Sequence, residues 1–403
     1  MNESTFLDKL LDGVDVQWLP LGEICEVKNG YTPSKSKTEL WENGTVPWFR
    51  MEDIRKNGRV LSGSIQHVTS AAVKNGKLFP ANSIIMSTTA TIGEHALITK
   101  DFLCNQQLTV LSIKESFKNI LSPKYLFYYG FKIGDLCRGS VSPVGFALVG
   151  TTKVRKFQIP IPCPENPEKS LAIQAEIVRI LDTFTELTTE LTTELTARTK
   201  QYNYYRDQLL TFEDCAVTWK ELGNVTEINT GQKPSEILER ATGFDYINAG
   251  TSRSGYSANS NCEGDIVTTP SRGQGGIGYV GYQKRPFWLG ALCYKMKSKD
   301  KDFLINKYLF YFLQSKRELL LGLKKEGGVP AVNKSDLAKL QIPVPSPTEQ
   351  ARIVAILDKF DTLTHSISEG LPREIELRQK QYEYYRDLLL NFPNPEPQTE
   401  GVA

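Results

Sequence analysis

The chain contains one stretch twice: residues 198–212 read RTKQYNYYRDQLLTF, and residues 378–392 read RQKQYEYYRDLLLNF. The copies are identical at 11 of 15 positions, which indicates an internal repeat. Working outward, shorter matches precede each copy: IVRILD and IVAILD at 177–182 and 353–358, then IPIP and IPVP at 159–162 and 342–345. The repeat therefore includes more than one element of structure.

The starts of the two halves also correspond. Six residues recur 201 positions later as Trp219, Leu222, Gly223, Gly231, Pro234 and Ser235; the first copies are Trp18, Leu21, Gly22, Gly30, Pro33 and Ser34. Between these framework pieces the halves hardly resemble each other. We infer two copies of one scaffold that perform two different versions of one task.

The segment before each tyrosine-rich copy predicts a long helix. In the first half, apolar residues recur at steps of three and four, the spacing of one helical face: Ile173, Ile177, Ile180, Leu181, Phe184, Leu187, Leu191 and Leu195. In the second half, Ser346-Pro347-Thr348-Glu349 is a capping box with proline in the first turn. Gly370-Leu371-Pro372 should kink or break that second helix.

The globular blocks mix short β-rich runs, such as Ser83–Ser87 and Gly264–Thr268, with glycine-rich turns. Each block ends in an aromatic, helix-like segment, Pro123–Tyr129 or Asn306–Phe312, whose nearly continuous apolar residues favour core packing over base stacking. The predicted class is α+β. We expect two similar globular domains at 1–165 and 213–345, helices at 166–212 and 346–392 (kinked near Pro372), and a disordered tail at 393–403.

The sequence Thr-Glu-Leu-Thr occurs three times in tandem, at 185–188, 189–192 and 193–196. Four residues turn a helix by about 400° and advance it by about 6 Å, so each unit shifts the leucine stripe by about 40°. One interpretation is a packing face. The other is a ruler between two domains, because adding or removing one unit changes the length and keeps the helix. The ruler would use Thr185, Leu187, Leu191 and Leu195.

Charge is distributed in alternating blocks. Residues 1–165 and 213–345 carry 19 and 18 basic side chains against 15 and 14 acidic ones. Residues 166–212 and 346–403 carry 5 and 6 basic against 7 and 10 acidic side chains. Two weakly basic blocks suit a polyanion, and two weakly acidic blocks suit protein partners.

Several classes of protein are excluded by what is missing. No apolar run reaches the length of a membrane span, and the first 11 residues do not resemble a secretion signal. Seven scattered cysteines without a C-x-x-C pair indicate reduced thiols, and therefore a cytoplasmic protein. Three distant histidines give no metal-ligand spacing. We therefore predict no metal, no cofactor and no catalytic residue in this chain.

One glycine-rich motif has two interpretations. Residues 273–278, GQGGIG, satisfy the dinucleotide pattern G-x-G-x-x-G, but a strand-and-turn sequence follows where that motif needs a helix. The alternative is a DNA-reading loop, since Arg272 can read guanine and Gln274 can read adenine. A phosphate loop of the ATP-hydrolysing type, G-x-x-x-x-G-K-[ST], is absent from the sequence.

At this framework the sequence resembles the specificity subunits of type I restriction-modification enzymes. The resemblance covers nearly the whole chain and includes the W-x-x-L-G starts, the IP-[IV]-P linkers, the repeated Q-Y-x-Y-Y-R-D and the stretch Ser87–Gly93. The tandem repeats resemble the subgroup in which such repeats space two recognition domains. The resemblance implies two α/β target-recognition domains separated by two long antiparallel helices.

The same resemblance implies partners and cofactors. The chain would bind double-stranded DNA, two methyltransferase subunits and one restriction/translocase subunit. S-adenosylmethionine would be held by the methyltransferase partner, and ATP with Mg by the restriction partner. A stand-alone bipartite DNA-binding regulator is the alternative function, which tight DNA binding by the chain alone would favour.

The candidate residues for contacts with DNA and with partner subunits are chosen by residue type, and not from the family resemblance. Candidate DNA-binding residues are Lys28, Tyr31, Lys35, Arg50, Thr89, Lys153, Arg155, Lys233, Arg253, Arg272, Gln274, Lys284, Arg285 and Lys334. Candidate partner-subunit contacts are Tyr202, Tyr205, Arg206, Tyr382, Tyr385 and Arg386. Packing of the two helices against each other is the other interpretation of these tyrosines.

Overall fold

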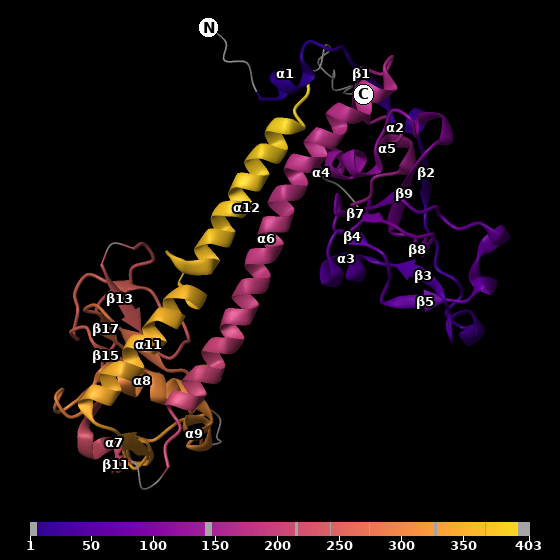
Figure 1. Ribbon diagram of the computed structural model, residues 1–403. Coiled ribbons are helices and arrows are strands. Elements are labelled where there is room, and N and C mark those ends of the chain that lie inside the picture. The colour runs from indigo at the N-terminus through magenta and orange to yellow at the C-terminus, as the bar shows by residue number, and fades with distance from the viewer. Residues whose placement is uncertain are drawn as a thin grey trace. The chain divides into compact units, whose positions relative to one another are not determined.

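The computed structural model describes residues 6–141, 147–213, 217–241, 243–273, 275–325, 329–366 and 368–393. The chain divides into two compact units, and Figure 1 shows both. Unit 1 comprises residues 1–189 and 377–403, and unit 2 comprises residues 190–376. The last predicted segment, 393–403, lies outside the described residues except for Pro393.

Unit 1 is built on a five-stranded sheet. Its strands, in order across the sheet, are β2 (Cys25–Asn29), β9 (Leu108–Ile113), β6 (Ser83–Ser87), β7 (His95–Ile98) and β4 (Val60–Leu61). All residues of β6 and β7 are buried, which is typical of strands covered on both faces. Helix α4 (Pro123–Gly139), the predicted aromatic segment, buries four of its aromatic side chains in the core: Tyr125, Phe127, Tyr128 and Tyr129.

Two smaller sheets complete the strands of unit 1. One has the order β5 (Gln66–Val68), β3 (Val46–Phe49) and β8 (Leu103–Cys104). The other pairs β1 (Val16–Pro20) with β10 (Gln158–Pro162), so the start and the end of the globular part lie side by side. The short helices are α1 (Phe6–Leu11), α2 (Leu21–Ile24), η1 (Thr38–Leu40), α3 (Met51–Asn57), η2 (Ser70–Ala72), η3 (Lys74–Gly76), η4 (Glu115–Phe117) and α5 (Thr151–Val154).

Unit 2 repeats this plan. Its main sheet has the order β12 (Thr226–Thr230), β18 (Cys293–Ser298), β15 (Ile266–Pro270) and β16 (Gly281–Gln283). The smaller sheets are β14 (Tyr256–Ser257), β13 (Phe244–Ile247) and β17 (Trp288–Leu289), and the pair β11 (Thr218–Glu221) and β19 (Gln341–Val344). The helices are α7 (Leu222–Val225), α8 (Asn306–Ser315), α9 (Arg317–Gly322) and α10 (Lys334–Ala338).

Three long helices follow the globular parts. Helix α6 (Pro167–Leu209) is continuous over 43 residues, and its threonines back-bond to carbonyls four residues earlier, for example Thr188 Oγ1 to Phe184 O at 2.9 Å. Helix α11 (Pro347–His365) begins at the predicted cap, where Ser346 Oγ accepts from the backbone N–H of Glu349 at 3.3 Å. Helix α12 (Gly370–Leu389) then starts at a glycine with φ +80°, where an added Cβ would lie 2.3 Å from Thr362 O.

Each core is completed by a helix end from the other repeat. In unit 1, Leu389, Leu390 and Phe392 join the core, and Tyr385 stacks on Phe184 with ring centroids 5.3 Å apart. In unit 2, Tyr202 and Leu210 join the core, and Tyr205 stacks on Phe360 at 5.8 Å. The predicted α+β class, with two similar domains and long helices that pack together, is confirmed.

Candidate nucleic-acid interface

A pocket of about 590 Å³ lies beside the three-stranded sheet of unit 1. It combines two tryptophans, two basic side chains and four amides, the residue types that stack on bases, neutralise phosphates and read base edges. The lining residues are Thr32, Lys35, Thr38, Trp41, Glu42, Trp48, Arg50, Gln66, Asn105, Gln106 and Gln107. Two of the predicted DNA contacts, Lys35 and Arg50, are thus brought together.

Arg50 is held in place by its own helix. It is the N-cap of α3, and the Asp53 carboxylate accepts a hydrogen bond from the Arg50 backbone N–H at 2.7 Å. Its guanidinium pairs with Glu52 at 3.0 Å and lies 5.7 Å from the centre of the Trp48 ring. The buried Nε has no hydrogen-bond partner among the described residues. The Arg50 side chain is 33% exposed, and a guanidinium fixed in this way is suited to bidentate recognition of guanine.

The amides of the pocket were not among the predicted contacts. Asn105, Gln106 and Gln107 follow directly after β8, where the Asn105 backbone N–H donates to Phe49 O at 3.1 Å. Asn105 Nδ2 donates to Gln107 Oε1 at 3.2 Å, which fixes the orientation of both amides. The signal in the sequence was an Asn-Gln-Gln run immediately after an apolar strand.

Four of the other five predicted contacts in unit 1 make internal hydrogen bonds or ion pairs, and the fifth is buried. Lys28 pairs with Glu26 at 2.5 Å, and the Tyr31 hydroxyl donates to Ala72 O at 2.9 Å. Lys153 and Arg155 donate to backbone carbonyls, and the Thr89 hydroxyl is buried without a hydrogen-bond partner among the described residues. These five side chains are therefore not gathered around the pocket.

In unit 2, Arg272 occupies the position that Thr89 has in unit 1. Thr89, the second residue after β6, bridges to Leu148, and Arg272, the second residue after β15, bridges to Ala331. Arg272 is exposed, whereas Gln274 lies outside the described residues. Two equivalent positions of the shared framework therefore both carry a predicted DNA contact.

The glycine-rich loop after Arg272 leads into strand β16 and not into a helix. An added Cβ at Gly276 would lie 1.9 Å from Ala249 O, so the glycine allows two backbone segments to approach closely. The dinucleotide interpretation needs a helix N-terminus at this point, and the structure does not provide one.

The remaining basic candidates of unit 2 are spread over its surface. Arg253 pairs with Asp245 at 2.9 Å, and this hydrogen bond and charge raise the pKa of the guanidinium. Lys334 Nζ donates to Asn229 Oδ1 at 3.2 Å. Lys233, Lys284 and Arg285 are exposed.

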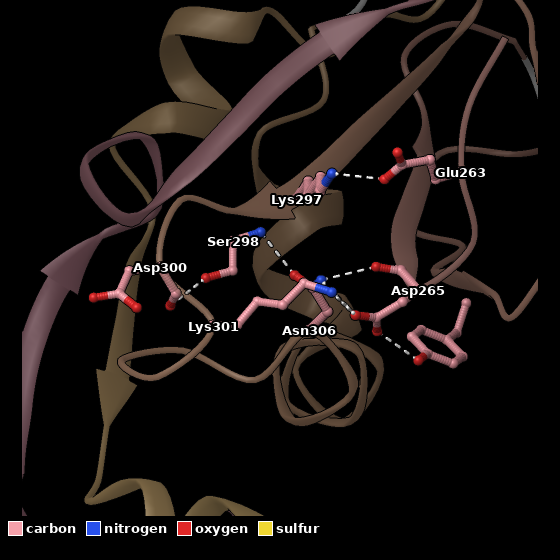
Figure 2. Close-up of polar contacts among 8 residues, drawn as sticks. Glu263, Asp265, Lys297, Ser298, Asp300, Lys301 and Asn306 are labelled. Carbon is pink, nitrogen blue, oxygen red and sulfur yellow. Dashed lines mark hydrogen bonds and ion pairs between the residues drawn. The ribbon is translucent and has the colours of Figure 1, made fainter.

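A polar network joins the end of β18, the residue before β15 and the start of α8 (Figure 2). Asp265 accepts from Tyr282 at 2.7 Å, from Lys301 at 3.0 Å and from Asn306 at 3.2 Å. Burial opposes the ionisation of Asp265, but these bonds outweigh it and lower its pKa. Asn306 Oδ1 accepts from Ser298 N at 2.7 Å, so the network braces the domain.

The duplicated tyrosines have distinct environments. Tyr202 is buried at 3% exposure, which matches the helix-packing interpretation, and Arg206 lies over its ring at 5.6 Å. Tyr382 is half-buried beneath Arg386 at 5.7 Å. Tyr204 and Tyr384, which belong to the same duplicated run, are 60% and 65% exposed.

The described ranges also contain no candidate for a metal site or for a membrane-spanning helix. No group of three His, Cys, Asp or Glu side chains there could hold a metal ion. Likewise, no helix in the described part of the chain has the length and hydropathy needed to cross a membrane.

Comparisons with known sequences identify the family. The model of the type I restriction modification DNA specificity domain matches residues 13–201 and 216–377. The EcoprrI specificity subunit of Escherichia coli is 46% identical over 394 residues, covering 92% of this chain and 93% of that one. The EcoR124I/EcoR124II specificity subunit of Escherichia coli is 36% identical over 423 residues, covering 98% and 99%.

Solved structures share the fold. The type I restriction-modification S subunit from M. genitalium has a TM-score of 0.58 at 17% identity, covering 95% of this chain and 98% of that one. A chain from a study of complex assembly in the type I R-M system has a TM-score of 0.62 at 17% identity, covering 93% and 97%. With the family model matching both halves, this chain belongs to the DNA specificity subunits of type I restriction-modification enzymes.

Proposed function

We propose that this specificity subunit, itself non-catalytic, reads a DNA target in two halves, one with each recognition domain. The proposed domains are residues 1–165 and 213–345, and the proposed spacer helices are 166–212 and 346–392. One observation supports the proposal most directly: the two domains share the same arrangement of sheets but differ in their surface residues. Two domains of one fold with different surface residues are suited to two different half-targets.

For the first half-target, we propose that the pocket of unit 1 is the reading site. Arg50 would contact guanine, Gln106 and Gln107 would contact adenine, and Lys35 would neutralise a phosphate. For the second half-target, Arg272 is the principal candidate, with Lys233, Lys284 and Arg285 as phosphate contacts. The other basic and polar candidates of both domains would make further contacts with phosphates or bases.

Replacing Arg50 tests the first reading site. Arg50→Ala should weaken binding of cognate DNA by about 1–3 kcal/mol and relax selectivity at one position of the first half-target. The assay is a competition between duplexes that differ at single positions, performed with the assembled enzyme. Arg55→Ala is the control, because Arg55 is exposed on the same helix and does not line the pocket. Equal weakening on every duplex would make Arg50 a phosphate contact.

We propose that two methyltransferase subunits and a restriction/translocase subunit assemble on this chain in the cytoplasm. Those partners hold S-adenosylmethionine, and ATP with Mg, respectively. The methyltransferase contact has two equivalent parts, centred on Tyr204 and Tyr384. Both are exposed aromatic side chains. Each ring packs edge-on against the ring of the tyrosine that follows it, with ring centroids 5.4 Å apart. An identical exposed feature in both units suits a partner that binds in two copies.

Removing these two rings should release the partner and leave the fold intact. Tyr204→Ala together with Tyr384→Ala should reduce methyltransferase binding by at least tenfold, because exposed aromatic side chains often dominate interface energies. Each single variant should still bind one copy. Sedimentation of the reconstituted complex measures the number of bound copies. Full assembly by the double variant would place the contact elsewhere on the chain.

We also propose that this chain belongs to the subgroup whose tandem four-residue repeats set the distance between the half-targets. The repeat units lie within α6, and Leu187, Leu191 and Leu195 are half-buried along it while Thr185 is exposed. A continuous helix suits a ruler because its length changes by a fixed amount per inserted unit.

A further inference from the structure

In both units the spacer helix is joined to the aromatic helix by a buried glutamine. Gln174 on α6 is fully buried; its Oε1 accepts from Ser122 N at 2.9 Å, and its Nε2 donates to Ile120 O at 2.6 Å. These two backbone groups directly precede α4. In unit 2 the same pair of bonds joins Gln350 on α11 to Ile305 N at 2.9 Å and to Phe303 O at 2.9 Å. We name this contact the amide clasp.

A carboxylate eight residues further along the same helix makes a second junction. Asp182 accepts from Lys124 Nζ at 2.5 Å and from the Tyr128 hydroxyl at 2.7 Å, both from α4. In unit 2, Asp358 on α11 accepts from two residues of α8, Lys307 at 2.8 Å and Tyr311 at 2.5 Å. We name this contact the carboxylate clasp.

The two clasps together resist both sliding and rotation of the aromatic helix. Eight residues are a little more than two helical turns, so both clasps lie on one face of the spacer helix. A slide would leave a fully buried amide without partners, which is costly. Burial also raises the pKa of Tyr128 and Tyr311 far above the ordinary value, so each hydroxyl keeps its proton and donates to the carboxylate.

The clasps are shared by the units, whereas the candidate base-reading residues differ. The run Lys-Tyr-Leu-Phe-Tyr is identical at 124–128 and 307–311, and the glutamine and aspartate recur at the same separation. The pocket residues 105–107, Asn-Gln-Gln, correspond to a different run, Gly-Ala-Leu at 290–292. The clasps therefore belong to the framework that the two units share, and not to the residues that differ between them.

We propose that the amide and carboxylate clasps are positioning elements that decide how strictly the enzyme selects the spacer between the two half-targets. Each clasp pair holds one recognition domain at one angle on its own spacer helix. This inference rests on the proposed bipartite reading. Loosening a clasp should let the domain adopt neighbouring angles, so that spacers one base pair longer or shorter are also accepted.

The test removes the carboxylate clasps and keeps everything that lines the base-reading sites. One variant carries Lys124→Met and Tyr128→Phe, a second carries Lys307→Met and Tyr311→Phe, and a third combines all four. The matched controls are Tyr125→Phe and Tyr308→Phe. These tyrosines lie on the same helices and lose the same hydroxyl, but they bond at 2.9 Å to carbonyls of β10 and β19 inside their own domains.

Methyl-transfer rates of the assembled enzyme are measured on duplexes with the native half-targets and a spacer that is native, one pair shorter or one pair longer. The rate ratio between native and altered spacers should fall at least about fivefold in each clasp variant, because two bonds to the aspartate are lost and one net hydrogen bond already corresponds to that scale. It should stay unchanged in the controls, and both half-target sequences should be preserved. Restoring one clasp in the four-substitution variant should recover part of the ratio.

Two results would overturn the inference. One is an unchanged spacer ratio in the four-substitution variant, even with a lower melting temperature, because the clasps would then only stabilise the fold. The other is an equal fall in the controls. Failure of the proposed function would look different, since the wild-type enzyme itself would then show no dependence on the spacer.

Discussion

Deletion of one Thr-Glu-Leu-Thr unit, residues 189–192, should shift the preferred spacer by one base pair and leave both half-targets unchanged. The deletion removes about 6 Å of helix and about 40° of rotation. One base pair of B-DNA rises about 3.4 Å and turns by about 35°. The rotation therefore matches one base pair, and tilt of the helix across the DNA would absorb the remaining length.

Sequencing the methylated sites of cells that carry the deletion variant measures the new spacer directly. A length-preserving variant, with Thr189→Ala, Thr192→Ala and Thr193→Ala, is the control, because it changes composition without changing distance. It should keep the original spacer. An active deletion variant that keeps the original spacer would show that the repeat is only a packing face of the helix and not a ruler.

Exchange of residues 220–340 for the matching block of a relative should replace one half of the methylated site completely. The two ends of this block are neighbours, since Lys220 pairs with Ile342 and Glu221 with Gln341 in the β11–β19 ribbon. A domain whose entry and exit lie on adjacent strands can be replaced without altering the path of the rest of the chain. The incoming block should retain the lysine and tyrosine that bond to Asp358.

The reciprocal exchange of residues 21–157, bounded by the β1–β10 ribbon, serves as the control and should alter only the other half. Methylated-site sequencing reads both outcomes. A change in both halves after a single exchange would mean that the two domains read DNA jointly.

Much of the framework was predictable because repetition makes it visible. The duplicated tyrosine-rich run, the IP-[IV]-P linkers and the Ile-Leu-Asp pieces correspond to elements that pack on one another in each unit. Ser346 was recognisable as a cap because the bond it makes is local. Gly370-Leu371-Pro372 predicted a kink or a break, and the chain forms two helices there, α11 and α12, since Gly370 adopts a positive φ.

The candidate site was harder to predict because its parts are distant in sequence. Arg50 and Lys35 could be selected by residue type, but Gln66 and the run at 105–107 approach them only through the β5–β3–β8 sheet, which contains short strands. The glutamines at 174 and 350 were overlooked for a similar reason. A polar residue on an apolar helical face has no visible purpose until the backbone groups that it satisfies are known.

Because each core is completed by a helix end from the other repeat, the two units become complete in a fixed order during synthesis. Unit 2 is made from one continuous stretch, residues 190–376, so every part of it has been synthesised before the C-terminal segment emerges. Unit 1 needs Leu389, Leu390 and Phe392 to close a core whose other members were translated first. Unit 1 is therefore the first to be synthesised and the last to complete its core. Part of its apolar surface stays exposed to solvent until the C-terminal helix has been synthesised.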